Sequence, residues 1–322
     1  MSPVRPPDTP VADTLRALEP ARVPVQDVST LACGPYDPGG QPRAAHDGFV
    51  LGLSAWNHRP WAEGRAMAVE AERLGLGLLV ADAADGADAL DAFAASDAVA
   101  VQTARAIVAP AVSLRAHLHP VHVARFVANL DHVAAGRGAL VFDAGDDAAR
   151  ARLFGLAPAA EPDAELDEFV TLVKHSWSWA TPFDFEGRFY ASRRNWLCGP
   201  RPTRAPRPWL ALRGGAETLE LAARSFDWLI LEGTTDVTLA QRARARAALG
   251  YGRRLLVFAS LEVTEASLEA IGPRIAVLAE VENFDGALLR FADGLRGLHE
   301  FGAEVLPTLR ANGLRWATLP PP

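Results

Sequence analysis

From Gly48 onward, short apolar runs alternate with stretches that have the periodicity of amphipathic helices. This alternation is typical of βα units arranged around a parallel sheet. Eight of the apolar runs have the length and composition of strands: Phe49 to Leu53, Leu76 to Ala81, Ala106 to Val112, Ala139 to Phe142, Trp209 to Leu212, Trp228 to Leu231, Leu255 to Leu261 and Leu314 to Ala317. Eight parallel strands close a (β/α)8 barrel. The sequence therefore predicts an α/β fold with a single TIM-type barrel over residues 48–322.

Three of the linking helices have clear ends. Helices are expected over Glu63 to Leu74 and over Val121 to Ala135, and a glycine follows each of them. Glycine readily takes the left-handed conformation that ends a helix. A third helix, over Asp163 to Trp179, begins with acidic residues, which the helix dipole favours.

Two segments stand outside the βα pattern. Residues 1–47 contain nine prolines and little periodicity apart from a short helical pattern at Val11 to Leu18. We expect them to form an N-terminal arm that lies on the barrel or is partly disordered. The long connection from Thr181 to Arg207 is rich in Pro, Arg and aromatic residues. We expect it to be a loop insertion that forms a lid or a wall of the active site.

Composition limits the partners and the compartment. In 322 residues, 32 Lys and Arg stand against 39 Asp and Glu, with no basic block that could follow a phosphate backbone, so nucleic acid is not an expected partner. Cys33 and Cys198 lie far apart without CxxC spacing, which indicates free thiols in a reducing compartment. No signal-peptide core and no apolar run of ~18 residues is present, so we expect a cytoplasmic protein without a membrane segment.

Asp82 is the first candidate site residue. It follows the apolar run LGLLVA, so its carboxylate is expected at the C-terminal mouth of the barrel, where TIM-barrel enzymes build their active sites. The alternative is that Asp82 caps the next helix or turn, as Asp often does. The sequence leaves both interpretations open.

A histidine motif, HxHxxH, follows the third predicted strand with His117, His119 and His122. Imidazoles at this spacing could ligate zinc or iron. The motif contains no acidic residue, and Pro120 starts a helix that carries His122 away from the strand direction. Histidines at a helix start more often make hydrogen bonds or contact a cofactor.

The turn Arg213-Gly214-Gly215 lies between a strand and a helix. Paired glycines there let backbone N–H groups approach a phosphate, and Arg213 adds positive charge. The alternative is a tight turn without a ligand. Aromatic residues before this turn could wall a flat pocket or pack the long connection onto the barrel: Trp177, Trp179, Phe183, Phe185, Phe189 and Tyr190.

The order of these motifs resembles the luciferase-like flavin-dependent monooxygenases, in particular the branch with nitrilotriacetate and dibenzothiophene-sulfone monooxygenases. The matching segments include AVEAERLGLGLLVAD, HPVHVARFVANLDHVAAGR, PFDFEGRFY and RPWLALRGGAETLELAARSFDWLI, within Phe49 to Ile230. The resemblance implies a (β/α)8 barrel that binds reduced FMN, usually delivered by a separate NAD(P)H-dependent flavin reductase. It also implies that O2 is used to oxygenate a small organic substrate, and that the enzyme is a homodimer.

The resemblance also assigns roles to residues. Asp82 and His122 would face the flavin, with His122 bonding the ring or assisting proton transfer and Asp82 orienting the ring or the substrate. Arg213 and the amides of Gly214 and Gly215 would hold the phosphate. This chain departs from the branch at Leu140 and Val141, which replace a Trp-Asn pair, and at the phosphate turn, where Gly-Ser-Ser has become Arg213-Gly214-Gly215. Glu217 follows closely, and a carboxylate there would repel a phosphate.

Three functions stay open at this point. The first is a flavin-dependent monooxygenase that works at Asp82, His122 and the Arg213 turn. The second is a divergent barrel without flavin chemistry that acts as a binding or assembly partner, and whether Glu217 fills the Arg213 turn bears on it. The third is a metal-dependent hydrolase that uses His117 and His119.

Overall fold

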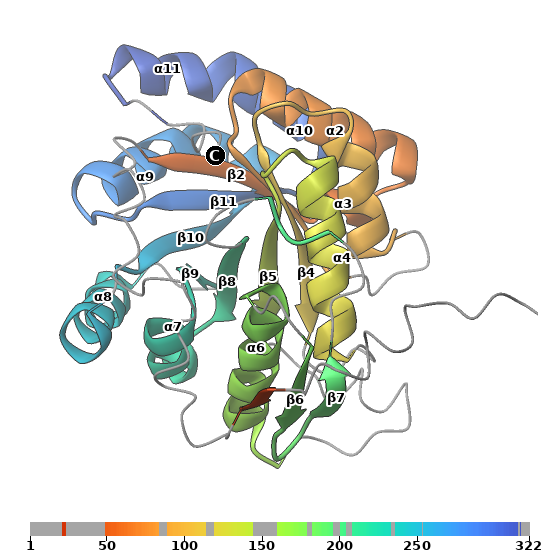
Figure 1. Cartoon of the computed structure of the whole chain (residues 1–322). Helices are drawn as coiled ribbons and strands as arrows, with labels where there is room; N and C mark the ends of the chain where they lie inside the picture. The colour runs from red at the N-terminus through yellow and green to blue at the C-terminus, as the bar shows by residue number, and fades with distance from the viewer. Residues whose placement is uncertain are drawn as a thin grey trace, which may run out of the picture.

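The computed structural model describes residues 49–83, 89–113, 119–143, 160–178, 182–195, 200–203, 208–232, 236–252, 254–314 and 316, with the backbone of 21–23. Eight parallel strands form a closed barrel in the order β10-β11-β2-β3-β4-β5-β8-β9 (Figure 1). The strands are β2 (Val50–Ser54), β3 (Leu78–Ala81), β4 (Ile107–Ser113), β5 (Ala139–Asp143), β8 (Trp209–Gly214), β9 (Trp228–Leu231), β10 (Leu256–Val263) and β11 (Gly286–Phe291). The predicted (β/α)8 fold is confirmed.

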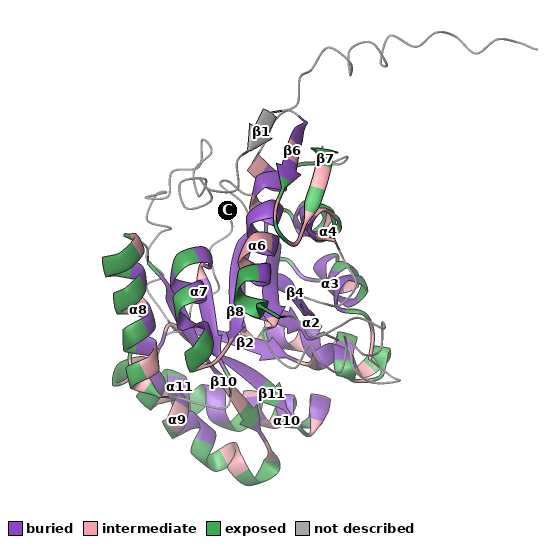
Figure 2. Ribbon diagram, turned by 90° about the horizontal axis from the view of Figure 1, so that it is seen from below, coloured by how far each residue is buried: buried purple, intermediate pink, exposed green. Residues whose placement is uncertain are grey.

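Helices surround the barrel, with buried inner faces and exposed outer faces (Figure 2). They are α2 (Trp61–Leu74), α3 (Ala92–Ala100), α4 (Pro120–Val133), α6 (Pro162–Ser178), α7 (Leu219–Ser225), α8 (Val237–Tyr251), α9 (Leu268–Glu280), α10 (Gly294–Glu300) and α11 (Leu306–Ala311). The three helices expected from the sequence are confirmed as α2, α4 and α6, with ends shifted by one or two residues. Gly75 closes α2 in the left-handed conformation, with φ 97°. Among the described helices, none combines the length and the apolar content that crossing a bilayer requires.

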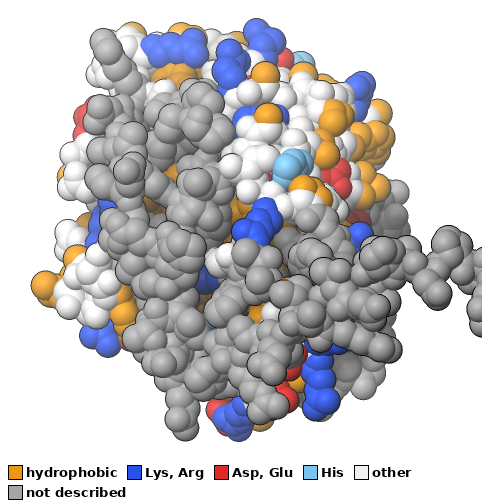
Figure 3. All heavy atoms as spheres, in the orientation of Figure 1, with side chains coloured by type: hydrophobic (Ala, Val, Ile, Leu, Met, Phe, Trp, Pro, Cys, Tyr) orange, Lys and Arg blue, Asp and Glu red, His pale blue; other side chains and the backbone are white. Residues whose placement is uncertain are grey.

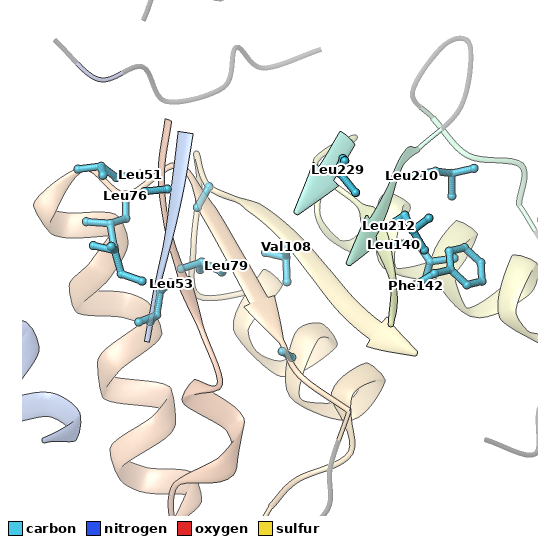
Figure 4. Close-up of a cluster of buried hydrophobic side chains, with 14 of the residues drawn as sticks. Leu51, Leu53, Leu76, Leu79, Val108, Leu140, Phe142, Leu210, Leu212 and Leu229 are labelled. Carbon is cyan, nitrogen blue, oxygen red and sulfur yellow. The ribbon is translucent and has the colours of Figure 1, made fainter. Parts of the chain in front are cut away.

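Side chains alternate along each strand between two apolar layers, as the pleat of a strand requires. The outer layer packs between the strands and the helices, and Figure 4 shows part of it around Leu79, Leu140 and Leu212. The inner layer fills the barrel. Its largest members are Trp209 and Trp228, whose rings stack 5.1 Å apart, with Phe258 5.6 Å from Trp228. The lower barrel is thus a packed core and not a channel.

The eighth strand is the one strand prediction that was wrong. Leu314 to Ala317 was expected to close the barrel, but β11 lies between β10 and β2 instead. Trp316 forms only an isolated bridge to Phe49. The sequence of β11 does not have the apolar pattern of a buried strand, because it starts with a glycine and contains Arg290. Gly286 is required there, since a Cβ would collide with the carbonyl oxygen of Val50.

The segment predicted as a loop insertion contains a hairpin, which corrects that expectation. Strands β6 (Phe183–Glu186) and β7 (Ala191–Asn195) pair antiparallel, and β1 (Ala21–Val23) adds parallel to β6. Phe183 and Phe185 are buried against Leu172 of α6, so these two aromatics pack the hairpin onto the barrel. Glu168 holds the hairpin turn by accepting the backbone N–H groups of residues 188–190.

The backbone of residues 21–23 is the described part of the N-terminal arm. The expected helix Val11 to Leu18, Cys33, Cys198 and Trp179 lie outside the described residues. On the face seen in Figure 3, Lys and Arg side chains occupy separate parts of the described surface instead of one large patch. The absence of a nucleic-acid partner stays a prediction.

Candidate functional site

A ring of polar side chains covers the apolar interior at the C-terminal ends of the strands. The inward-facing positions that follow the inner apolar layer, one from each strand, are Ser54, Asp82, Ser113, Asp143, Arg213, Glu232, Ser260 and Arg290. We call these eight residues the mouth ring. The ring contains three carboxylates and two guanidinium groups, so it carries an excess of negative charge. The C-terminal ends of the strands are where barrel enzymes place their chemistry.

Arg213 contacts three carboxylates of this ring, and its side chain is only 3% exposed. Its guanidinium donates to Asp82 Oδ1 at 2.8 Å, and its other nitrogens lie 3.5 Å from Glu232 and 3.7 Å from Asp143. Burial lowers the pKa of Arg213, but the three carboxylates outweigh burial and raise that pKa above its ordinary value. Arg213 is therefore a permanent buried cation whose charge is already compensated.

Asp82 is held by side chains from both sides of the barrel. Its second carboxylate oxygen accepts from Arg290 at 3.1 Å. Its backbone N–H and carbonyl both bond the side-chain amide of buried Asn57, at 2.8 and 2.7 Å. The cap of α3 is Asp91, so Asp82 does not cap that helix. Its carboxylate instead forms part of a fixed ionic network.

Two further members of the mouth ring, Glu232 and Ser113, carry groups that can transfer a proton or form a hydrogen bond. Glu232 is 43% exposed, and desolvation raises its pKa, with Arg213 opposing this effect and Asp143 and Asp82 adding to it. The hydroxyl of Ser113 is buried without a hydrogen-bond partner among the described residues. Ser113 lies beside Asp143 in the strand register. The mouth therefore holds one carboxyl group with a raised pKa and one hydroxyl that bonds none of the described residues.

The histidine motif is divided by the fold. His119 is the N-cap of α4, where its Nδ1 accepts the Val121 N–H at 3.3 Å and its Nε2 bonds the Ala191 carbonyl at 3.3 Å. Both ring nitrogens are thus engaged in one neutral tautomer, inferred from these bonds. Burial lowers the pKa of His119, the Ala191 bond opposes this effect and His122 adds to it, which fits a neutral ring.

His122 lies in the first turn of α4 and is exposed, and His117 lies outside the described residues. Among the residues that the structure describes, no three His, Cys, Asp or Glu side chains are grouped so that they could hold a metal ion. Since His119 serves as a helix cap, the metal-dependent hydrolase loses one of its two proposed ligands.

The turn Arg213-Gly214-Gly215 is occupied by the chain's own side chains. Oε1 of Glu217 accepts the N–H of Gly215 at 3.0 Å, and Thr218 Oγ1 donates to the Gly215 carbonyl at 2.9 Å. Arg213 points away from Glu217 into the mouth ring. The turn and the buried cation, which the resemblance joins into one phosphate site, are thus separate in this chain.

Asn57, Asp143, Glu232 and Arg290 were not predicted from the sequence. Asp143 ends β5, Glu232 follows β9, Arg290 lies inside β11 and Asn57 lies in the short 3-10 helix after β2. Strand alternation carries a signal for Asp143, Glu232 and Arg290, because each is the next inward position after an apolar one. That signal could be used only once the strand ends were known.

A cavity of about 760 Å³ lies at the opposite end of the barrel, lined by Phe49, Arg244, Leu255 and Asp285 among others. Asp285 bonds Arg244 at 2.6 Å and the Val257 N–H at 2.8 Å. These bonds tie α8 to the starts of two strands. This end therefore stabilises the barrel, as the N-terminal face of such folds commonly does.

Comparisons with known proteins identify the family and the fold of the chain. Residues 36–270 match the model of the luciferase-like monooxygenase family. No curated protein matches the chain. Solved structures do: a riboflavin lyase (RcaE) with modified FMN and riboflavin aligns with a TM-score of 0.71 at 16% identity, covering 84% of this chain and 93% of that one.

Two further structures have a similar fold. EDTA monooxygenase (EmoA) from Chelativorans sp. BNC1 aligns with a TM-score of 0.69 at 15% identity, over 83% of this chain and 95% of that one. An F420-dependent secondary alcohol dehydrogenase aligns with a TM-score of 0.66 at 16% identity, over 82% and 99%. At these identities the likeness shows the fold alone.

Proposed function

Because the chain belongs to the luciferase-like monooxygenase family, we propose that it is a flavin-dependent monooxygenase that uses reduced FMN and O2 to oxygenate a small organic substrate. The reaction site is the mouth ring. The observation that carries this proposal is the buried pair of Asp82 and Arg213, which sits on the apolar barrel interior at the catalytic end of the fold.

The residues fit the two ends of FMN differently. A flavin ring needs an apolar slot with a few fixed polar groups, and the mouth ring offers buried Arg213, Asp82 and the unused hydroxyl of Ser113 above an apolar layer. The phosphate does not fit the Arg213 turn as it stands, since Glu217 occupies the Gly215 N–H. We therefore assign the flavin ring to the residues of the mouth ring, and we assign no residue to the phosphate.

Each residue has a definable task in this proposal. A bound reduced flavin supplies the electrons that O2 needs. Asp82, fixed by Asn57, orients Arg213, so that the cation is held in place before any substrate binds. Glu232, whose pKa is raised by desolvation, can deliver a proton from its carboxyl group. His122 remains a proposed second contact of the flavin.

The partners and the compartment belong to the same proposal. A monooxygenase of this kind needs a source of reduced flavin, for which we propose a separate NAD(P)H-dependent flavin reductase in the cytoplasm. A homodimer and the nitrilotriacetate and dibenzothiophene-sulfone branch also stay predictions. Since the secondary alcohol dehydrogenase with a similar fold carries F420 in its name, F420 is the other cofactor to test.

Binding of the cofactor tests the proposal. Purified protein is titrated with FMN and, without oxygen, with reduced FMN, while absorbance and flavin fluorescence are recorded. We expect micromolar or tighter binding of the reduced form. If neither form bound at a few hundred micromolar, the flavin function would be rejected.

One observation favours a second function. Glu217 fills the turn that would take a phosphate, and Arg213 is already paired. Both features suit a divergent barrel that keeps its fold as a binding or assembly partner without flavin chemistry. The same titration separates the two functions, because a partner barrel binds neither FMN nor reduced FMN.

A further inference from the structure

Glu217 stands where an anionic ligand of the glycine turn would be. Its Oε1 lies 3.0 Å from the Gly215 nitrogen and accepts that N–H. A carboxylate and a phosphate compete for the same backbone donor, since both are anions that accept charge-assisted hydrogen bonds. The turn therefore already contains an anion, supplied two residues later in the same chain.

The closed arrangement explains one of the two glycines of the turn. A Cβ at Gly214 would lie 2.6 Å from Thr218 Oγ1, so this position needs glycine for Thr218 to fold back over the backbone. A Cβ at Gly215 would lie 2.9 Å from Glu217 Oε2, the far end of a flexible side chain that can shift. Gly214 therefore has a reason other than a bound phosphate.

The charges around the turn also oppose a phosphate. Arg213, the cation next to the turn, lies 2.8 Å from Asp82, 3.5 Å from Glu232 and 3.7 Å from Asp143. Its positive charge is more than balanced by these carboxylates. A phosphate, with a charge of about -1.5 to -2 at neutral pH, would meet Glu217 and Glu232 before it met an unpaired cation.

We propose that Glu217 is a built-in anion that determines cofactor specificity, because its carboxylate keeps a phosphate out of the turn. The barrel then binds a flavin through the flavin's ring system and the chain attached to it, and it does not distinguish FMN from riboflavin. The flavin part of this inference rests on the function proposed above. The exclusion of phosphate from the turn does not depend on it.

The flavin part is tested by titrating the protein separately with FMN and with riboflavin. In the wild type we expect the two dissociation constants to agree within about threefold. Glu217→Ala should shift the ratio at least about tenfold toward FMN, with riboflavin binding unchanged. Glu217→Gln removes the charge but keeps an oxygen that can accept the N–H, so its ratio should lie between the two.

Glu220→Gln is the matched control. It removes the same charge one helical turn away, where the carboxylate pairs with Arg246, and it should leave the ratio unchanged. A wild-type preference for FMN of tenfold or more would overturn the inference, as would an unchanged ratio in Glu217→Ala.

Thermal unfolding in inorganic phosphate and in chloride of equal ionic strength separates this inference from the flavin function. Phosphate raises the Tm of any folded protein somewhat, because it is excluded from protein surfaces, so the gain in Tm from chloride to phosphate should be larger in Glu217→Ala than in wild type. If the variant shows this larger gain while no flavin binds, the flavin function fails and the role of Glu217 stands. If the gain in Glu217→Ala is no larger than in wild type, the role of Glu217 is wrong.

Discussion

The lower interior of the barrel and the mouth ring are built on the same eight strands but from opposite chemistry. The lower layers hold stacked Trp209 and Trp228 with no charged group, whereas the next inward positions carry Asp82, Arg213 and Glu232. Packing of apolar rings stabilises a fold directly. Buried charges add little net stability, because desolvation offsets their attraction.

This difference separates what holds the barrel together from what it does. A network of buried charges that costs desolvation energy is typical of functional sites. The lower interior should therefore respond to mutation through stability alone. The mouth ring should respond through charge, pH and ligand binding.

The largest effect is expected in the lower interior. Trp228→Ala removes a fully buried ring that packs on Trp209 and Phe258, and it should lower the free energy of unfolding by about 4 to 5 kcal/mol. Trp228→Phe keeps an aromatic ring in this layer and breaks no hydrogen bond to the described residues, so it should cost less, about 1 to 2 kcal/mol. Urea unfolding measures both, and equal losses would contradict the packing account.

Removing the buried cation comes next. Arg213→Met leaves Asp82, Asp143 and Glu232 without their shared partner and should destabilise the protein by about 3 kcal/mol. Arg290→Met is the control, because Arg290 bonds the same Asp82 carboxylate but is 46% exposed. It should cost at most about 1 kcal/mol. A similar loss in the two variants would show that burial does not set the difference.

A smaller, pH-dependent effect is expected at Glu232. Desolvation raises its pKa above the ordinary value of 4.5, so the folded state binds this proton more tightly than the unfolded state. As the pH rises above 4.5 and through the raised pKa, ionisation of Glu232 therefore lowers the free energy of unfolding. Glu232→Gln should become more stable relative to wild type over this range, by Tm measured against pH. A constant difference at every pH would refute the assignment.

The smallest effect on stability is expected at Glu217. This residue is exposed and accepts one hydrogen bond, from the Gly215 N–H across the turn, so Glu217→Ala should change the free energy of unfolding by less than about 1 kcal/mol. Its effect should appear in ligand specificity instead. A large loss of stability would place Glu217 with the structural carboxylates such as Glu168, which accepts three backbone N–H groups.

Most of the fold could be predicted from the sequence, because periodicity reports directly on buried faces. Seven of the barrel strands and the helices α2, α4 and α6 are visible in the sequence as apolar patterns. The eighth strand was missed because Gly286 and Arg290 break its apolar run. Both residues are set by distant parts of the chain: Gly286 by the approach of Val50, and Arg290 by its bond to Asp82.

The site was predictable in part for the same reason. Asp82 and Arg213 were found because each directly ends a strand, and the structure brings their side chains together. Their mutual pairing could not be predicted, since it joins strands that are 131 residues apart in sequence. The closure of the glycine turn by Glu217 was expected only as repulsion of a phosphate, and the structure adds the hydrogen bond to Gly215.

The most direct test of the central claim is a crystal structure of the protein grown with FMN. The account predicts density for the flavin ring at the mouth ring, against Asp82, Arg213 and Ser113, with the phosphate away from Gly215 and Glu217 still on the Gly215 N–H. A flavin ring bound elsewhere, such as the cavity beside Arg244 and Asp285 at the opposite end, would contradict the assignment of the mouth ring as the reaction site.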